Sequence, residues 1–255
     1  MSKQGRKKQV LWIRVSTIKK ALIGLCLLIV FIAVATYQIP AAKTTGSLGL
    51  PLSGKVIALD AGHGGPDGGA VSKQGVIEKD INLAIALYLR DYLQQAGAIV
   101  VMTREGDYDL AGDTRGYSKR KTEDLKQRAK FIEDKHADLF LSIHMNSFPS
   151  NRYRGAQTFY YPNHPDNAGL AALIQDEIKR NLENTDRVAK TVNTVYLLQA
   201  LKMPSALVEV GFLSHPQESE LLRDESYQRK VAASVYKGVL RYLSGEKAKV
   251  SSENP

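Results

Sequence analysis

The chain has 255 residues, of which 44% are hydrophobic, so it is long enough for one sizeable domain core or at most two small ones. Eight of its 35 lysines and arginines lie in residues 1–53, a segment without aspartate or glutamate, and the remainder is therefore nearly neutral. A nucleic-acid-binding domain needs a broad cationic surface to meet the phosphate backbone. The net charge of +9 comes largely from the N-terminal segment, so the nearly neutral remainder lacks such a surface. We therefore do not expect nucleic acid as a partner.

The N-terminus predicts a membrane anchor. A basic head, residues 1–20, precedes an uncharged run, residues 21–42, that is long enough to cross a hydrocarbon core of about 30 Å as a helix. Since positive charge stays on the cytoplasmic side, the rest of the chain should lie outside the cytoplasm. The length of the run favours an uncleaved transmembrane signal anchor, and cleavage between 33 and 42 is the alternative. The only cysteine, Cys26, lies in this run, so no intramolecular disulfide can form.

A short linker rich in small and turn-forming residues, 43–53, leads into a segment where apolar strand patterns alternate with amphipathic helix patterns. This alternation predicts an α/β fold: a single domain, 54–245, with a mostly parallel twisted sheet flanked by helices on both faces, preceded by one N-terminal transmembrane helix. A polar tail, 246–255, follows, and the polar stretch 107–121 is expected to be an exposed loop. The expected strands are 56–60, 98–103, 139–145, 157–161 and 206–210, and the expected helices are 78–95, 122–135, 167–183 and 226–243.

Reactive side chains follow or end several of these strands. His63 comes three residues after the first strand, His144 ends the strand in LFLSIHMN, and Glu209 ends the strand in ALVEV. Because the loops leaving parallel strands converge on one edge of the sheet, these side chains should gather there. Glu78 opens the helix after the glycine-rich loop and can turn back over His63. Two imidazoles and one carboxylate suit a tetrahedral zinc site with its fourth position open to water.

The same residues suggest a hydrolytic chemistry. A bound zinc lowers the pKa of its water to about 7, which supplies a nucleophile at neutral pH. A second carboxylate is then needed to take the proton of that water and to deliver it to the leaving group. Glu209 is the candidate, since a carboxylate within the apolar stretch ALVEVGF is costly unless it is paired or catalytic. The glycines between 62 and 69 allow a sharp turn after the strand and keep bulk away from the site.

Each of these residues also has a simpler interpretation. Glu78 can be an acid that interacts only with the dipole of the helix it opens, and the sequence weighs this equally with a ligand role. The remaining histidines, His136, His164 and His215, lie in polar surroundings without matching partners, which indicates structural hydrogen bonding. A phosphate-binding function for the glycine loop is weakly supported, because neither GxGxxG nor GxxxxGK[ST] is present.

Four stretches, IALDAGHGGPDGGA, GVIEKDINLAIA, LSIHMNS and ALVEVGFLSHPQE, resemble in order and spacing the zinc-dependent N-acetylmuramoyl-L-alanine amidases of the Amidase_3 type. The resemblance covers nearly all of residues 54–245. It implies one zinc ion per chain, held by His63, Glu78 and His144, with Glu209 as the catalytic acid and base.

Further stretches, PLSGK, GYSKRKTEDLKQR, GAQTFYY and IKRNLENTDRVAK, resemble the germination-specific branch of endospore formers. This implies hydrolysis of the amide between the lactyl group of N-acetylmuramic acid and L-alanine in spore cortex peptidoglycan. A separate deacetylase would then form muramic δ-lactam. The expected location is extracytoplasmic, in the forespore intermembrane space, with the domain anchored to the membrane or exported. Because there is no length for a wall-binding module, an accessory activator protein is a possible partner.

Several alternative functions stay open at this point. One is a vegetative cell-wall amidase, and another is a peptidase or deacetylase that uses the same metal on the same polymer. A third is a non-catalytic or partner-dependent regulatory protein that binds peptidoglycan. A glycosidase that uses Glu78 and Glu209 as its carboxylate pair would explain neither histidine.

Overall fold

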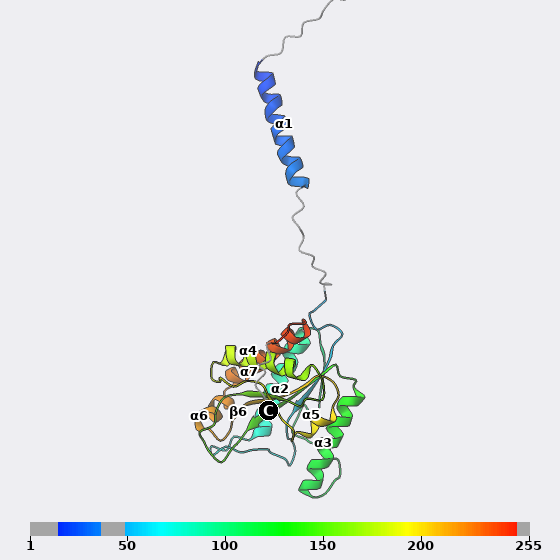
Figure 1. The fold of residues 1–255 in the computed structure, drawn as a ribbon, viewed down its shortest axis with the longest axis vertical. Helices are drawn as coiled ribbons and strands as arrows, with labels where there is room; N and C mark the ends of the chain where they lie inside the picture. Colours follow the sequence, from blue (N-terminus) through cyan, green and yellow to red (C-terminus); the bar gives the residue numbers. More distant parts are fainter. Residues whose placement is uncertain (1–14, 37–48, 249–255) are drawn as a thin grey trace, which may run out of the picture. The chain divides into compact units, whose positions relative to one another are not determined.

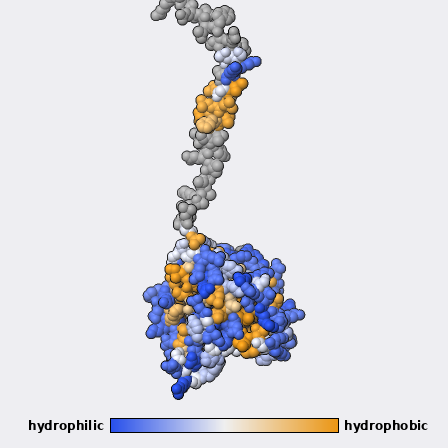
Figure 2. All heavy atoms as spheres, turned by 180° about the vertical axis from the view of Figure 1, so that it is seen from behind, coloured by the Kyte–Doolittle hydropathy of each residue, from blue (hydrophilic) through white to orange (hydrophobic). Residues whose placement is uncertain are grey.

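The computed structural model describes residues 15–36 and 49–248, which belong to two separate units. The first contains one helix, α1 (Val15–Thr36), whose hydrophobic side chains between Leu22 and Ile32 are exposed (Figure 2). The predicted spanning segment, 21–42, is helical as far as Thr36, and its last residues lie outside the described part of the chain. Among the helices of the two described ranges, none is both long enough and apolar enough to cross a membrane.

The second unit is built on a six-stranded sheet with the strand order β2-β1-β3-β6-β4-β5. Pairing is parallel between β1 and β2, β1 and β3, β3 and β6, and β4 and β5, whereas β4 and β6 are antiparallel. The strands are β1 (Val56–Ala61), β2 (Ile99–Met102), β3 (Leu139–Asn146), β4 (Gln157–Tyr160), β5 (Lys190–Thr191) and β6 (Ser205–Phe212).

The sheet is therefore mixed rather than parallel throughout. The reason lies in the connection from β3 to β4, which contains no helix. A parallel strand requires a crossover that returns the chain to the other end of the sheet, usually through a helix. Without one, β4 runs in the direction opposite to β3, and it pairs antiparallel with β6.

Helices cover both faces of this sheet, as the sequence predicts (Figure 1). Alternate residues of β3 show the two layers, because Leu141 and Ile143 enter the larger hydrophobic cluster and Phe140 enters the smaller one. The larger cluster packs against α2, α4 and α7, and the smaller one packs against α3 and α5. The helices are α2 (Glu78–Gln95), α3 (Tyr117–Asp134), α4 (Asn167–Leu182), α5 (Tyr196–Ala200), α6 (Pro216–Arg223) and α7 (Glu225–Leu243).

The main differences from the sequence prediction concern segment ends and short elements. Helix α3 begins at Tyr117, directly after Gly116 with its positive φ of 87°, so the predicted loop 107–121 ends five residues earlier. The last residues of the predicted linker pack on the folded unit, since Leu52 is buried and its N–H donates to the carbonyl of Ala96. The elements β5, α5 and α6 were not predicted, because runs of two to eight residues carry too little periodicity.

Candidate metal centre

The predicted site residues do meet at the carboxyl edge of the sheet. His144 on β3 and Glu209 on β6 are Cα partners in the parallel ladder, so their side chains leave the same face of the sheet side by side. His63 lies two residues beyond the end of the neighbouring strand β1, and Glu78 is the first residue of α2. Elements far apart in the sequence thus bring four reactive groups to one place.

The loop after β1 has a backbone that only certain residues allow. His63 itself has a positive φ of 64°, which is uncommon for a residue with a side chain. At Gly62, an added Cβ would overlap the imidazole of His144, so glycine permits the close approach of the loop to β3. The abundance of glycine around one histidine is therefore explained by space for the second histidine as well as by the turn.

Two buried arginines hold this loop in place through hydrogen bonds to its backbone carbonyls. Arg128 donates to the carbonyl of His63 at 2.6 Å and to the carboxylate of Asp60 at 2.6 Å. Arg104 donates to the carbonyls of Ala61 and Gly62 at 2.8 and 3.0 Å. Sequence analysis missed both arginines, since nothing in their spacing distinguishes them from surface residues. They compensate carbonyl groups that the sharp turn leaves without backbone partners.

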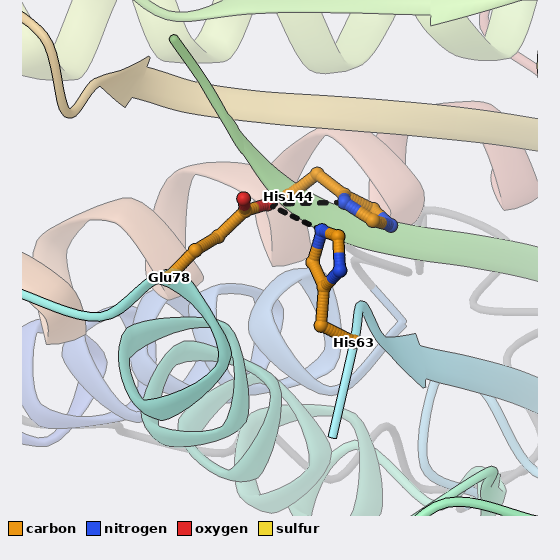
Figure 3. A group of neighbouring side chains, drawn as sticks. All are labelled: His63, Glu78 and His144. Atoms are coloured by element: carbon orange, nitrogen blue, oxygen red, sulfur yellow. Dashed lines mark hydrogen bonds and ion pairs between the residues drawn. The ribbon is translucent and has the colours of Figure 1, made fainter. Parts of the chain in front are cut away.

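His63, Glu78 and His144 form a compact trio in which each side chain faces the other two (Figure 3). Glu78 Oε1 lies 3.2 Å from His63 Nε2 and 3.1 Å from His144 Nδ1. One potential ligand atom from each residue lies within 4.8 Å of the others, and this is the only such group of three or more found within residues 15–36 and 49–248. The interpretation of Glu78 as an acid that serves the helix dipole alone is therefore not sufficient.

The spacing from the Glu78 carboxylate to the two imidazoles fits a small tetrahedral metal ion. Zinc bound by imidazole nitrogen and carboxylate oxygen at about 2.0–2.1 Å implies distances of about 3.3 Å between neighbouring ligand atoms. The two distances from Glu78 Oε1, 3.2 and 3.1 Å, are close to that value. Two nitrogen donors and one oxygen donor are also a ligand set that zinc accepts in hydrolases. The residues present therefore fit the metal that the family resemblance implies.

Glu78 is held in place by donors on both oxygens. Oε2 accepts the backbone N–H of Ala70 at 2.9 Å, and Oε1 accepts the N–H of Met145 at 3.0 Å and the amide of Asn82 at 3.3 Å. Burial alone would raise the pKa of Glu78, but the histidines beside it hold that pKa well below its usual range. The side chain is thus a fixed anion at neutral pH.

His63 has a second carboxylate partner that the sequence analysis did not identify. Asp67 Oδ2 lies 2.9 Å from His63 Nδ1, which leaves Nε2 directed at Glu78. Burial lowers the pKa of His63, but Asp67 and Glu78 outweigh this and raise it to about 9. Asp67 is in turn held by Tyr117 and Lys121 at the start of α3. A carboxylate that orients the far nitrogen of a histidine is the usual companion of a metal ligand.

Glu209 has the opposite surroundings. Its Oε2 atom is buried and has no hydrogen-bond partner. Burial raises the pKa of Glu209 to about 7. His144 opposes this rise, the nearby carboxylate of Glu78 adds to it, and His63 opposes it more weakly. A carboxyl group with a pKa near neutrality can both accept and release a proton under ordinary conditions.

Two of the other histidines make the structural hydrogen bonds that the sequence indicates. His164 Nδ1 accepts the backbone N–H of Asp166, and His215 caps α6 by accepting the N–H of Glu218. His136 occupies the turn after α3 with a positive φ of 49°. None of them belongs to the trio.

Known proteins are similar to this chain in fold and in sequence. The family model described as N-acetylmuramoyl-L-alanine amidase, Amidase_3, matches residues 57–241. The chain is 56% identical over 196 residues to the germination-specific N-acetylmuramoyl-L-alanine amidase of Bacillus subtilis, an alignment that covers 76% of this chain and 82% of the relative. It is also 31% identical over 244 residues to the amidase LytC of the same organism, across 93% of this chain and 46% of LytC.

Among solved structures, the CwlD amidase of Clostridioides difficile, determined in complex with the GerS lipoprotein, superposes with a TM-score of 0.73. The two sequences are 43% identical, and the match covers 75% of this chain and all of that one. The fold, the extent of the family match and the level of identity agree. The chain belongs to the Amidase_3 family of N-acetylmuramoyl-L-alanine amidases.

Proposed function

We propose that this amidase is a zinc enzyme in which His63, Glu78 and His144 hold the metal and Glu209 is the catalytic acid and base. The observation that carries the proposal is the contrast within the centre: a trio of converging ligand atoms lies beside a buried carboxyl oxygen with no partner. An unpartnered buried carboxylate is costly to the fold, so its retention favours a chemical role.

Zinc, when bound, would supply Lewis-acid activation of water and polarisation of the amide carbonyl. The residues of the chain supply the remaining requirements. Asp67 orients His63, and the backbone N–H groups of Ala70 and Met145 orient Glu78, so the ligand atoms are preorganised. The arginines beneath the loop keep the backbone of His63 in its turn.

Glu209 handles the protons of the reaction. It accepts the proton of the attacking water and then delivers this proton to the nitrogen of the departing L-alanine, which leaves as a free amine. Its position directly beside His144 in the ladder supports this role, because both side chains leave the sheet on one face. Its pKa of about 7 suits a group that must both take and give a proton near neutral pH.

The substrate we propose is the amide between the lactyl group of N-acetylmuramic acid and L-alanine in spore cortex peptidoglycan. The name of the Bacillus subtilis relative, a germination-specific amidase, supports the cortex, and release of the peptide would prepare muramic δ-lactam formation. The alternative on the same chemistry is a vegetative cell-wall amidase. Comparing germination and vegetative growth of a deletion strain separates the two.

We further propose that the domain acts outside the cytoplasm, in the forespore intermembrane space, where residues 1–42 anchor or export it. The basic head followed by an uncharged run supports this. An accessory protein is a second element of the proposal, supported by the GerS lipoprotein bound to the related CwlD structure. Fractionation of spore membranes, and copurification with a tagged chain, test the two statements separately.

One experiment tests the enzymatic proposal directly. The full-length chain is purified in detergent, its zinc content is measured, and cortex-type peptidoglycan is digested with mass-spectrometric analysis of the products. One zinc per chain together with new L-alanine amino termini on intact stem peptides is the expected result. Cleavage within the stem would indicate a peptidase, and free amino groups on the sugars would indicate a deacetylase. Bound zinc without any product would favour the regulatory alternative.

A further inference from the structure

The row of side chains that contains the proposed catalytic residues continues past Glu209. Glu209 is the Cα partner of His144 on one side and of Gln157 on the other. Partners in neighbouring strands share a face of the sheet, so Gln157 extends the row by one strand. Gln157 Oε1 accepts a hydrogen bond from Arg187 Nη1 at 3.1 Å. The row therefore ends in a guanidinium group on the loop after α4.

The hydrogen bonds of the Arg187 side chain go to groups without charge. Its Nε donates to the carbonyl of Arg154 at 3.0 Å, and its guanidinium carbon lies 5.1 Å from the centre of the Phe212 ring. The carboxylate that influences it from nearby, Glu218, is buried and uses its two oxygens for the backbone N–H groups of Gly155 and Phe212. No ion pair of Arg187 exists among the described residues.

Several other arginines of the domain do pair with carboxylates, although Arg104, like Arg187, has no such pair among the described residues. Arg241, for example, lies against the carboxylates of both Glu177 and Glu246. Arg187 has a similarly fixed side chain but no ion pair within the described residues, where Glu218 is a nearby carboxylate, and its hydrogen bonds to those residues use two of its N–H groups. A guanidinium carries five N–H donors in a planar fork that matches a carboxylate. The unused donors of Arg187 are therefore available to a ligand.

Space for a ligand exists beside this residue. Arg187 lines a cavity of about 900 Å³, together with Arg154 and Lys179. Three carboxylates, Glu183, Asp186 and Glu218, line the same cavity, so attraction of anions by overall charge is not the basis of recognition. Recognition depends instead on the fixed fork of Arg187, which is the lining cation joined by hydrogen bonds to the catalytic row.

We propose that Arg187 forms a carboxylate-binding subsite for the stem peptide on the leaving-group side of the scissile amide. The inference rests on the proposed function, because it takes the row from His144 through Glu209 as the line along which the amide lies. An acidic residue that follows L-alanine would pair with the fork of Arg187. The enzyme then distinguishes stem peptides by charge close to the bond it cleaves.

Equilibrium binding tests the subsite without turnover. The zinc-loaded full-length Glu209→Gln variant is titrated with two N-acetylmuramoyl-L-alanyl-glutamyl ligands, one with both glutamyl carboxylates free and one with both converted to carboxamides. A charge-assisted fork contact predicts that the diacid binds about tenfold more tightly. Adding Arg187→Gln should reduce this preference to less than about twofold, with little change for the diamide.

Two further variants serve as controls. Arg229→Gln removes one positive charge from an exposed pair on α7 and should preserve the preference. Arg187→Lys keeps the charge without the fork and should retain only part of it. Equal binding of the two ligands by the parent protein, or an equal weakening of both by Arg187→Gln, would overturn the subsite. Cleavage of the diacid by the unmodified chain is measured separately, so that failure of the proposed function is distinguished from failure of the subsite.

Discussion

The start of α2 and the end of β6 each bring a glutamate to the candidate metal centre, and the two carboxylates have opposite surroundings. Glu78 accepts backbone N–H groups on both oxygens and has two histidines beside it, so its pKa lies well below the usual range. Glu209 has a buried oxygen without a partner, and its pKa is raised to about 7. One group is fixed as an anion, and the other can exchange a proton.

This difference shows that residue type does not determine the role of a carboxylate. The donors around Glu78 stabilise its charge and its orientation, which are the properties a metal ligand needs. The lack of donors around Glu209 leaves its charged form poorly stabilised, which is the property a general base near neutral pH needs. The first arrangement requires an unfavourable positive φ at His63 in the loop after β1. The second requires a buried carboxyl oxygen without a partner at the apolar end of β6.

The largest expected effect comes from replacing each of the two glutamates, Glu209 and Glu78, by glutamine in turn. Glu209→Gln should lower kcat by about 10²–10⁴-fold and leave one zinc per chain, because it removes proton transfer and no proposed ligand. Glu78→Gln should lose both zinc and activity. Turnover of peptidoglycan and zinc content of the purified variants measure the two effects.

The exposed Glu220→Gln on α6 is the matched control, since Glu220 pairs only with Arg223 and its loss should change neither quantity. Normal turnover in Glu209→Gln would contradict the assignment of the acid and base. Retained zinc in Glu78→Gln would contradict the ligand assignment instead.

A second change tests how much the buried ion pair between Arg128 and Asp60 stabilises the protein. Burial alone would raise the pKa of Asp60, but Arg128, and after it His144, Ser142 and Thr103, lower that pKa to about 2. Arg128→Leu leaves that carboxylate buried without its ion pair and leaves the carbonyl of His63 without its donor. We expect the free energy of unfolding to fall by about 3–5 kcal/mol, measured by urea denaturation at pH 7.

The exposed Arg229→Leu should leave the free energy of unfolding nearly unchanged in the same assay. Combining Arg128→Leu with Asp60→Asn should recover part of the loss, because the unpaired charge is then absent. A loss for Arg128→Leu no greater than that of the exposed control would show that the network does not support the loop.

Two glycines with positive φ angles separate contact with the proposed ligands from backbone strain. Gly69 has a φ of +68°, and an added Cβ there would lie 2.6 Å from Glu78 Oε2 and 2.7 Å from His63 Cδ2. Gly69→Ala should therefore displace two proposed ligands and weaken zinc binding by about 10–100-fold, as changes next to metal ligands do. Competition with a chromophoric chelator gives the affinity.

Gly75, with a φ of +80°, has no heavy atom within 4 Å of an added Cβ. Gly75→Ala introduces the same kind of backbone strain, about 1 kcal/mol, without touching the centre. It should lower stability slightly and keep the zinc affinity. An equal loss of zinc in both variants would mean that strain in the loop, and not contact with the ligands, explains the effect.

Much of the fold could be predicted because long elements carry strong periodicity. Helix α2 spans the predicted residues, and β1, β3, β4, β6, α4 and α7 differ by at most two residues at either end. The direction of β4 could not be predicted, since it depends on the absence of a crossover helix and not on the pattern of the strand. The prediction of a mostly parallel sheet agrees with four of the five strand pairings, and the antiparallel pairing of β4 with β6 is the exception.

Within the centre, the sequence predicted the convergence of His63, Glu78 and His144 from strand ends and from the family resemblance. It did not predict Asp67, although this aspartate follows His63 by four residues in the same glycine loop. Arg128 and Arg104 could not be found at all, because both donate to backbone carbonyls of the turn and the ion pair of Arg128 with Asp60 joins residues 68 positions apart. The resemblance supplied the roles that spacing alone left open.

The smallest effect concerns pH and depends on the burial of Glu209. The carboxylate form is the base, and in the metal-free protein burial raises its pKa from 4.5 to about 7. A bound zinc ion would lower this pKa again, so the activity of the zinc enzyme should rise with pH through a midpoint between these two values. Below that midpoint, kcat/KM should fall by about tenfold per pH unit. An acid limb with its midpoint near pH 4.5 would show that Glu209 is not the titrating base.

The raised pKa also has a consequence for stability that is independent of catalysis. Because the folded protein binds the proton of Glu209 more tightly than the unfolded chain does, this residue reduces stability as the pH rises from 4.5 through 7. Glu209→Gln removes the titration, so the metal-free variant should be more stable than the metal-free parent at pH 8 and similar at pH 4.5. Thermal unfolding at the two pH values measures this difference. A variant that loses turnover while it gains stability at high pH would show that the fold retains Glu209 for its chemistry, whereas equal stability of the two proteins at pH 8 would show that its surroundings do not disfavour the charge.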